Sequence, residues 1–180
     1  FPQLGDNGIV SHNIVSGIED AAIYVGMSDN VHVAHNDVFD SVAGIEIENS
    51  RHAVVEANRV YNNTGGILAF ITPGLPIKTT FDVIIRNNFI IANNHPNFGA
   101  PGSTVAGIPA GTGILVMAAD DVVIEGNRIT RVMSVGAPGG SKEDPNRPKL
   151  AAGGREIDLR GHYVMPGIVD MHGHIGGEEQ

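Results

Sequence analysis

The chain has 180 residues, a formal net charge of −9, 24 glycines, and neither cysteine nor tryptophan. This length allows one sizeable domain, the acidity argues against nucleic acid or an anionic membrane as a partner, and the lack of cysteine excludes disulfides and thiolate metal sites. No stretch approaches the roughly 18 apolar residues of a membrane-spanning helix. Because the chain begins at Phe1 without an initiator methionine, we expect a fragment or a processed form.

A repeat of about 22 residues runs through the first two thirds of the chain. Its units share two alternating apolar positions, an asparagine, a further apolar residue, a polar turn and then Gly-Ile-x-apolar. The copies are "NGIVSHNIVSGIEDAAIYVG" from Asn7, "NVHVAHNDVFDSVAGIEIENS" from Asn30, "HAVVEANRVYNNTGGILAF" from His52, "DVIIRNNFIIANN" from Asp82 resuming as "GTGILVMAA" from Gly111, and "DVVIEGNRIT" from Asp121.

One asparagine occupies the same position in every unit, with spacings of 23, 22, 30 and 39 residues. These aligned residues are Asn13, Asn36, Asn58, Asn88 and Asn127. The two long spacings contain insertions rich in proline and glycine, at residues 71–80 and 95–112. We interpret the asparagines as a structural ladder, because a buried amide can bond the backbone at a bend and the neighbouring units.

Short strands of period two in stacked units of this length predict a right-handed single-stranded parallel β-helix of about five coils over residues 1–135. The predicted inward positions before each asparagine are Val31, Val33, Ala53, Val55, Val83, Ile85, Val122 and Ile124. Those after the glycine are Ile23, Val25, Ile45, Ile47, Ile67, Ala69, Ile114 and Val116. Stacked burial of these side chains would form the core.

The motifs "DAAIYVGMSDNVHVAHNDVFDSVAGIEIENS" and "NRVYNNTGGILAFITPGLP" resemble bacterial parallel β-helix repeat proteins of the carbohydrate-binding and sugar-hydrolase type over residues 1–130. The resemblance implies a polysaccharide-related or purely structural role, a polysaccharide as partner and an extracytoplasmic location, periplasmic or secreted. The chain lacks the Asp-Pro-His-Glu string of alginate epimerases and the Asn-Thr-Asp and Arg-Ile-Lys strings of polygalacturonases.

The outward positions of the Gly-Ile strand are the candidate site. They form one predicted stack of Tyr24, Glu46, Leu68 and Leu115 and a second of Glu48, Phe70 and Met117. Either the two insertions fold back over these apolar positions, or they leave a groove. In the second case Glu46 and Glu48 are candidate catalytic carboxylates, with Tyr24 and Phe70 as candidate ligand-binding aromatics.

The composition changes after Val135, where residues 136–155 read as a linker rich in proline and glycine. From Asn127 to the end, the chain resembles the start of the amidohydrolase superfamily. The resemblance lies chiefly in "REIDLRGHYVMPGIVDMHGHIGG", which runs from Arg155 into the tail over residues 156–180. That resemblance implies that His172 and His174 match two metal ligands of its first barrel strand. Hydrolytic zinc needs at least three protein ligands, so the set is incomplete.

Three functions therefore stay open: a β-helix scaffold or polysaccharide-related protein without a complete active site, a metal-dependent amidohydrolase, and an engineered or recombinant chimera. We expect no cofactor unless zinc binds through His172 and His174. The open strand edges of a solenoid also predict end-to-end or edge-mediated self-association, unless the tail covers the last coil.

Overall fold

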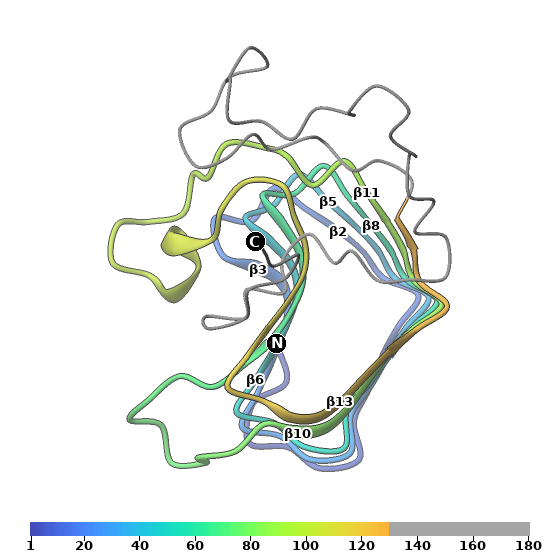
Figure 1. The fold of residues 1–180 in the computed structure, drawn as a ribbon, viewed down its shortest axis with the longest axis vertical. Coiled ribbons are helices and arrows are strands. Elements are labelled where there is room, and N and C mark those ends of the chain that lie inside the picture. The colour runs from blue at the N-terminus through green and yellow to red at the C-terminus, as the bar shows by residue number, and fades with distance from the viewer. Residues whose placement is uncertain (130–180) are drawn as a thin grey trace, which may run out of the picture.

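The computed structural model describes residues 1–129, which form three parallel sheets wound from successive coils of the chain (Figure 1). The first sheet contains β1 (Ile9–Ser11), β4 (His32–Ala34), β7 (Val54–Glu56), β10 (Phe81–Arg86) and β13 (Asp120–Glu125). The second contains β2 (Ile14–Ser16), β5 (Asp37–Phe39), β8 (Arg59–Tyr61), β11 (Phe89–Ile91) and β14 (Arg128–Ile129). The third contains β3 (Ala21–Gly26), β6 (Ala43–Glu48), β9 (Gly65–Phe70) and β12 (Thr112–Met117).

Each coil contributes one strand to each sheet, so the described residues form a parallel β-helix of four complete coils and the start of a fifth. This confirms the predicted fold. The predicted linker at 136–155 and tail at 156–180 lie outside the described residues. Within residues 1–129, no helix has the length and apolar character needed to cross a bilayer.

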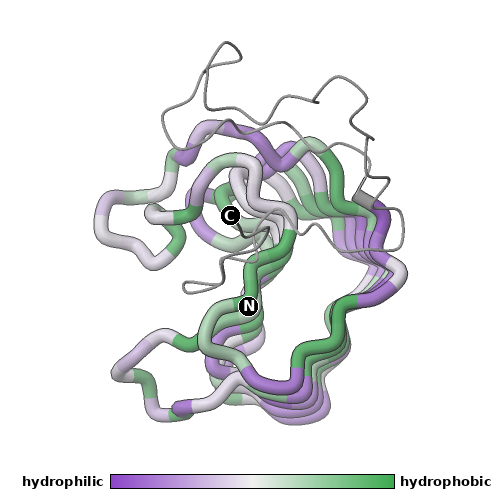
Figure 2. Tube along the Cα trace, viewed as in Figure 1, coloured by the Kyte–Doolittle hydropathy of each residue, from purple (hydrophilic) through white to green (hydrophobic). Residues whose placement is uncertain are grey.

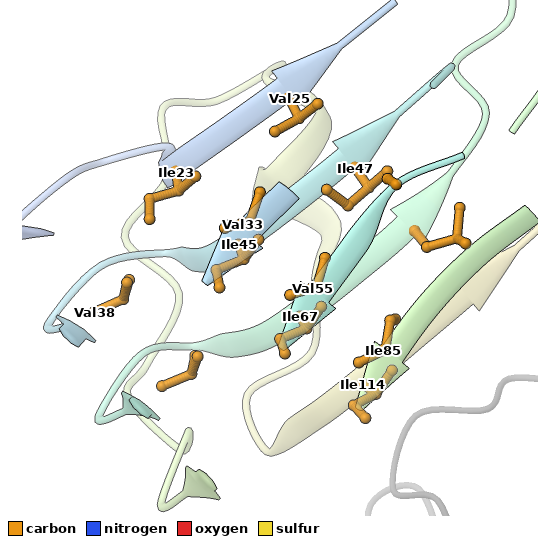
Figure 3. Packing of buried hydrophobic residues seen from close by; sticks show 14 of the residues in the cluster. Ile23, Val25, Val33, Val38, Ile45, Ile47, Val55, Ile67, Ile85 and Ile114 are labelled. Carbon is orange, nitrogen blue, oxygen red and sulfur yellow. The ribbon is translucent and has the colours of Figure 1, made fainter. Parts of the chain in front are cut away.

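The core is a set of apolar columns inside the coils. Ile23, Ile45, Ile67 and Ile114 lie in register on the four strands of the third sheet, and each is at most 4% exposed. All the inward residues predicted from the repeat belong to this core or pack against it. Figure 2 shows apolar and polar segments superimposed from coil to coil, and Figure 3 shows the stacked aliphatic side chains.

The aligned asparagines form a continuous ladder at the corner between the first and second sheets. The backbone N–H and the Nδ2 of Asn36 both donate to Oδ1 of Asn58, at 3.0 and 2.9 Å, and Asn58 donates in the same way to Asn88. Nδ2 of Asn58 also donates to the Val33 carbonyl of the preceding coil at 3.0 Å. Asn13 and Asn127 continue the pattern at the two ends. Each buried amide thus connects three coils.

A second ladder, which the sequence analysis missed, lies at the corner between the second and third sheets. The N–H of Ser41 donates to Oδ1 of Asn63 at 2.9 Å, and Asn63 donates through N and Nδ2 to Oδ1 of Asn93 at 3.0 and 2.9 Å. All three residues are at most 4% exposed. Ladders of buried hydrogen bonds at two corners fix the register of successive coils.

The two insertions leave the third sheet at opposite ends of its strands. One follows β9, and the other, which contains a short 3-10 helix (η1, Thr104–Gly107), precedes β12. Figure 1 shows both projecting on the same side of the molecule. The second covers part of the sheet, because Val105 and Ile108 pack with Leu68 and Phe70. The first is attached by Asn49, whose Nδ2 donates to the carbonyls of Thr72 and Ile77.

Candidate functional site on the outer face of the third sheet

The side chains of β3, β6, β9 and β12 that point away from the core form what we call the outer face. Its strand register is the predicted one: Tyr24 pairs with Glu46 and Glu46 with Leu68, while Glu48 pairs with Phe70. Leu115 and Met117 of β12 complete the two columns. The coil containing β6 therefore places two carboxyls where the following coils have apolar side chains.

Glu48 is the centre of a hydrogen-bond network that joins three segments of the chain. Tyr24 Oη donates to its Oε2 at 2.5 Å, and Thr72 Oγ1 of the first insertion donates to its Oε1. The Tyr24 side chain reaches Glu48 by crossing Gly26, where a Cβ would lie only 2.0 Å from Tyr24 Oη. Glycine at this position therefore permits the contact. Acceptance through both oxygens suits a carboxylate.

Glu46 is in a different environment from Glu48. Its side chain is 2% exposed, and its Oε2 has no hydrogen-bond partner among the described residues. Burial, followed by repulsion from Glu48 and Asp20, raises the pKa of Glu46 to about 8. Glu46 is therefore a neutral acid at pH 7. Burial and the hydrogen bond to Glu48 also raise the pKa of Tyr24 above its ordinary value.

The aromatic residues of the outer face differ in exposure. Phe70 is 2% exposed and packs with Leu68, Val105 and Ile108, so its ring belongs to the contact beneath the second insertion. Tyr24 is partly exposed and stacks on Phe1, with ring centroids 4.3 Å apart. Phe1 is 80% exposed. The accessible aromatic surface is thus Tyr24 with Phe1, a residue that the sequence analysis did not select.

Charged clusters also occur near the corners of the first sheet. Glu56 contacts Arg86 Nε at 2.7 Å and His32 Nε2 at 2.8 Å, and the hydrogen bond from Arg86 is the main reason why the pKa of Glu56 is lowered. Asp29 contacts Arg51 and His52, at 2.9 and 2.5 Å. Within residues 1–129 no three potential metal-ligating side chains cluster closely enough to hold an ion. His172 and His174 lie outside the described residues.

The geometry defines a class of protein: a parallel β-helix with one sheet face elaborated by insertions and an acid pair. Residues 3–75 match the family described as "Right handed beta helix region", which agrees with the predicted hand of the coil. No curated protein and no solved structure gives a significant match to the chain. The family description names neither a substrate nor an activity.

Proposed function

We propose that the protein binds a saccharide at the β3 edge of the outer face, where Tyr24 and Phe1 form an accessible aromatic surface. The observation that carries this proposal is the buried Glu46 carboxyl with an unpartnered oxygen, two residues from Glu48 and in register with the partly exposed Tyr24. Buried polar groups without partners are uncommon and are concentrated at functional sites. Aromatic faces and carboxyls together provide the apolar and hydrogen-bonding contacts that sugar rings need.

The accessible part of the outer face is confined to the edge strand β3. Every residue of β6 and β9 is buried, and Val105 and Ile108 of the second insertion pack on Leu68 and Phe70. Tyr24 is partly exposed, and Phe1 and Asp20 beside it are exposed. A sugar ring would therefore contact Tyr24 and Phe1 at this edge.

Calorimetric titration with a panel of neutral and charged oligosaccharides tests this proposal. We expect Tyr24→Ala to weaken binding at least about tenfold, because the loss of an aromatic anchor usually has an effect of this size. Tyr61→Ala is the matched control, since Tyr61 stacks on Phe39 on the second sheet, away from the outer face. Equal losses in both variants, or no binding by any member of the panel, would contradict the proposal and leave the scaffold role.

A second candidate function is cleavage of the bound saccharide. At neutral pH a protonated Glu46 would be the acid and Glu48 the base, which is the division of roles used by glycoside hydrolases. Release of reducing ends by the wild type, lost in both Glu46→Gln and Glu48→Gln, would support this role.

The amidohydrolase alternative depends on residues outside the described part of the chain. It predicts bound zinc that is lost on substitution of His172 or His174. Metal analysis of the full 180-residue chain, compared with His172→Ala, tests it. Zinc in a one-to-one ratio that disappears in the variant would favour the alternative.

A further inference from the structure

Within residues 1–129, the carboxyls around β6 form no ion pair with a positively charged group. Asp20 immediately precedes β3, and both it and Glu48 act electrostatically on Glu46. None of the ion pairs within residues 1–129 includes any of these three carboxyls. The arginine pairs instead neutralise Asp29, Asp37 and Glu56. Among the residues that the structure describes, the outer face near Tyr24 therefore carries negative charge that no ion pair neutralises.

The Glu46 carboxyl is an independent observation that points to a ligand in this region. Its side chain is 98% buried, yet Oε2 receives no hydrogen bond from the described residues. Every oxygen of the neighbouring Glu48 has a donor. The outward register of Glu46, between Tyr24 and Leu68, directs its side chain to the outer face rather than to the core. A donor that reaches this carboxyl would pair an oxygen that has no partner among residues 1–129.

We infer that the site takes a protonated amino sugar, so that the bound saccharide is a chain containing glucosamine-type residues. The primary ammonium group would lie against the Tyr24 ring, in the field of Asp20 and Glu48, where cation–π and charge-assisted contacts act together. This inference rests on the proposed saccharide-binding function and deepens it. A polyuronate would meet repulsion instead, since the chain has 20 acidic against 11 basic residues.

The test compares three hexamers with the full chain at about pH 6: glucosamine, N-acetylglucosamine and galacturonate oligomers. Acetylation removes the ammonium charge and leaves the ring, so we expect the glucosamine hexamer to bind roughly 10- to 100-fold more tightly than its acetylated counterpart. Added salt should reduce this preference because part of it is electrostatic. Calorimetry in buffers of different ionisation enthalpy should detect release of protons, since a bound cation favours ionised Glu46.

Two variants test whether the carboxyls near Tyr24 cause the preference for the glucosamine hexamer over its acetylated counterpart. Glu48→Gln should abolish most of it, whereas Asp121→Asn, which removes one exposed charge on β13, should leave it intact. If Glu48→Gln does not fold, the effects of salt and acetylation in the wild type decide the matter alone.

Three outcomes overturn the inference. Equal or tighter binding of the acetylated hexamer would refute the amino-sugar assignment while the proposed saccharide-binding function stands. Equal affinity for spermidine, a polyamine without a sugar ring, would show that the site recognises an ammonium group only. Failure of all three hexamers to bind would remove both proposals.

Discussion

The buried carboxyl of Glu46 should make the fold less stable as the pH rises. In the unfolded chain its pKa is near 4.5, and in the folded protein it is about 8. Below pH 4.5 Glu46 is protonated in both the folded and the unfolded state, so its ionisation does not change the free energy of unfolding. Between these two values only the unfolded chain ionises, which favours unfolding, and above about pH 8 the loss is complete.

The size of the effect follows from the same two pKa values. Each pH unit between them corresponds to about 1.36 kcal/mol. The fold should therefore lose on the order of 3 kcal/mol between pH 4.5 and 7, and on the order of 5 kcal/mol once Glu46 is fully ionised. This is a large part of the 5–15 kcal/mol that is typical of whole domains, as an order of magnitude.

Denaturant unfolding of the wild type and Glu46→Gln at several pH values between about 5 and 9 measures this loss. Glutamine keeps the shape of the side chain but cannot ionise, so the stability of the variant relative to the wild type should increase as the pH rises. Glu125→Gln, at an exposed position on β13, is the control and should show no such trend.

The diagnostic quantity is how the difference in free energy of unfolding between Glu46→Gln and the wild type changes with pH. The size of that difference at a single pH is not diagnostic. The new amide changes local hydrogen bonds by an amount that does not depend on pH, and titration of groups distant from Glu46 cancels between variant and wild type. A difference that stays constant from pH 5 to 9 would refute the reasoning. It would mean that Glu46 is hydrated or paired in solution and ionises as an ordinary carboxyl.

The remaining predictions concern the solenoid itself. Asn58→Ala should lower the free energy of unfolding by roughly 3–5 kcal/mol, because it leaves several buried groups unpaired, while Thr79→Ala at an exposed position should have little effect in the same denaturant assay. Gly66→Ala would place a Cβ 2.2 Å from a carbonyl oxygen of β12 and should lower the melting temperature, unlike Gly107→Ala, which meets no atom within 4 Å. Glu56→Gln should make unfolding, measured by circular dichroism, less sensitive to acid. The pKa of Glu56 is lower in the folded protein than in the unfolded chain, so its ionised form stabilises the wild type at pH values above the unfolded pKa. This stabilisation is lost as the pH falls through the folded pKa. Unchanged stability in Asn58→Ala or Gly66→Ala, or an identical acid transition in Glu56→Gln, would contradict the corresponding contact.

The fold could be predicted because a solenoid repeats its local pattern at equivalent positions. Asn88 and Asn127 were aligned across 39 residues, and the structure places them in direct contact, with Nδ2 of Asn88 2.9 Å from Oδ1 of Asn127. The insertion between them changes the spacing but not the strand pattern on either side of it. Strand periodicity and the asparagine position are local properties, which a single sequence displays.

The second ladder was missed although the sequence contains a signal for it. Asn63 and Asn93 each follow a residue of the first ladder by five positions, as Ser41 follows Asn36. The mixture of serine and asparagine obscures this regularity. The burial of Phe70 confirms the predicted alternative in which an insertion folds back over the outward positions. The sequence could not decide between this alternative and a groove, because the path of an 18-residue insertion is set by long-range contacts.

The contrast between Glu46 and the columns around it shows why a site can be placed on this face. β6 is hydrogen-bonded along its length to β3 on one side and β9 on the other, and its inward residues Ile45 and Ile47 are completely buried. The backbone position of Glu46 is therefore determined by neighbouring coils and by the core, independently of its own side chain. A β-helix can in this way hold an unfavourable carboxyl in a fixed place, since the stability it removes locally is restored by coils on both sides. A selective site requires that its polar groups are held rigidly in place. The outer face holds such a group in Glu46, whereas the buried polar side chains of the two corner ladders are already paired with one another.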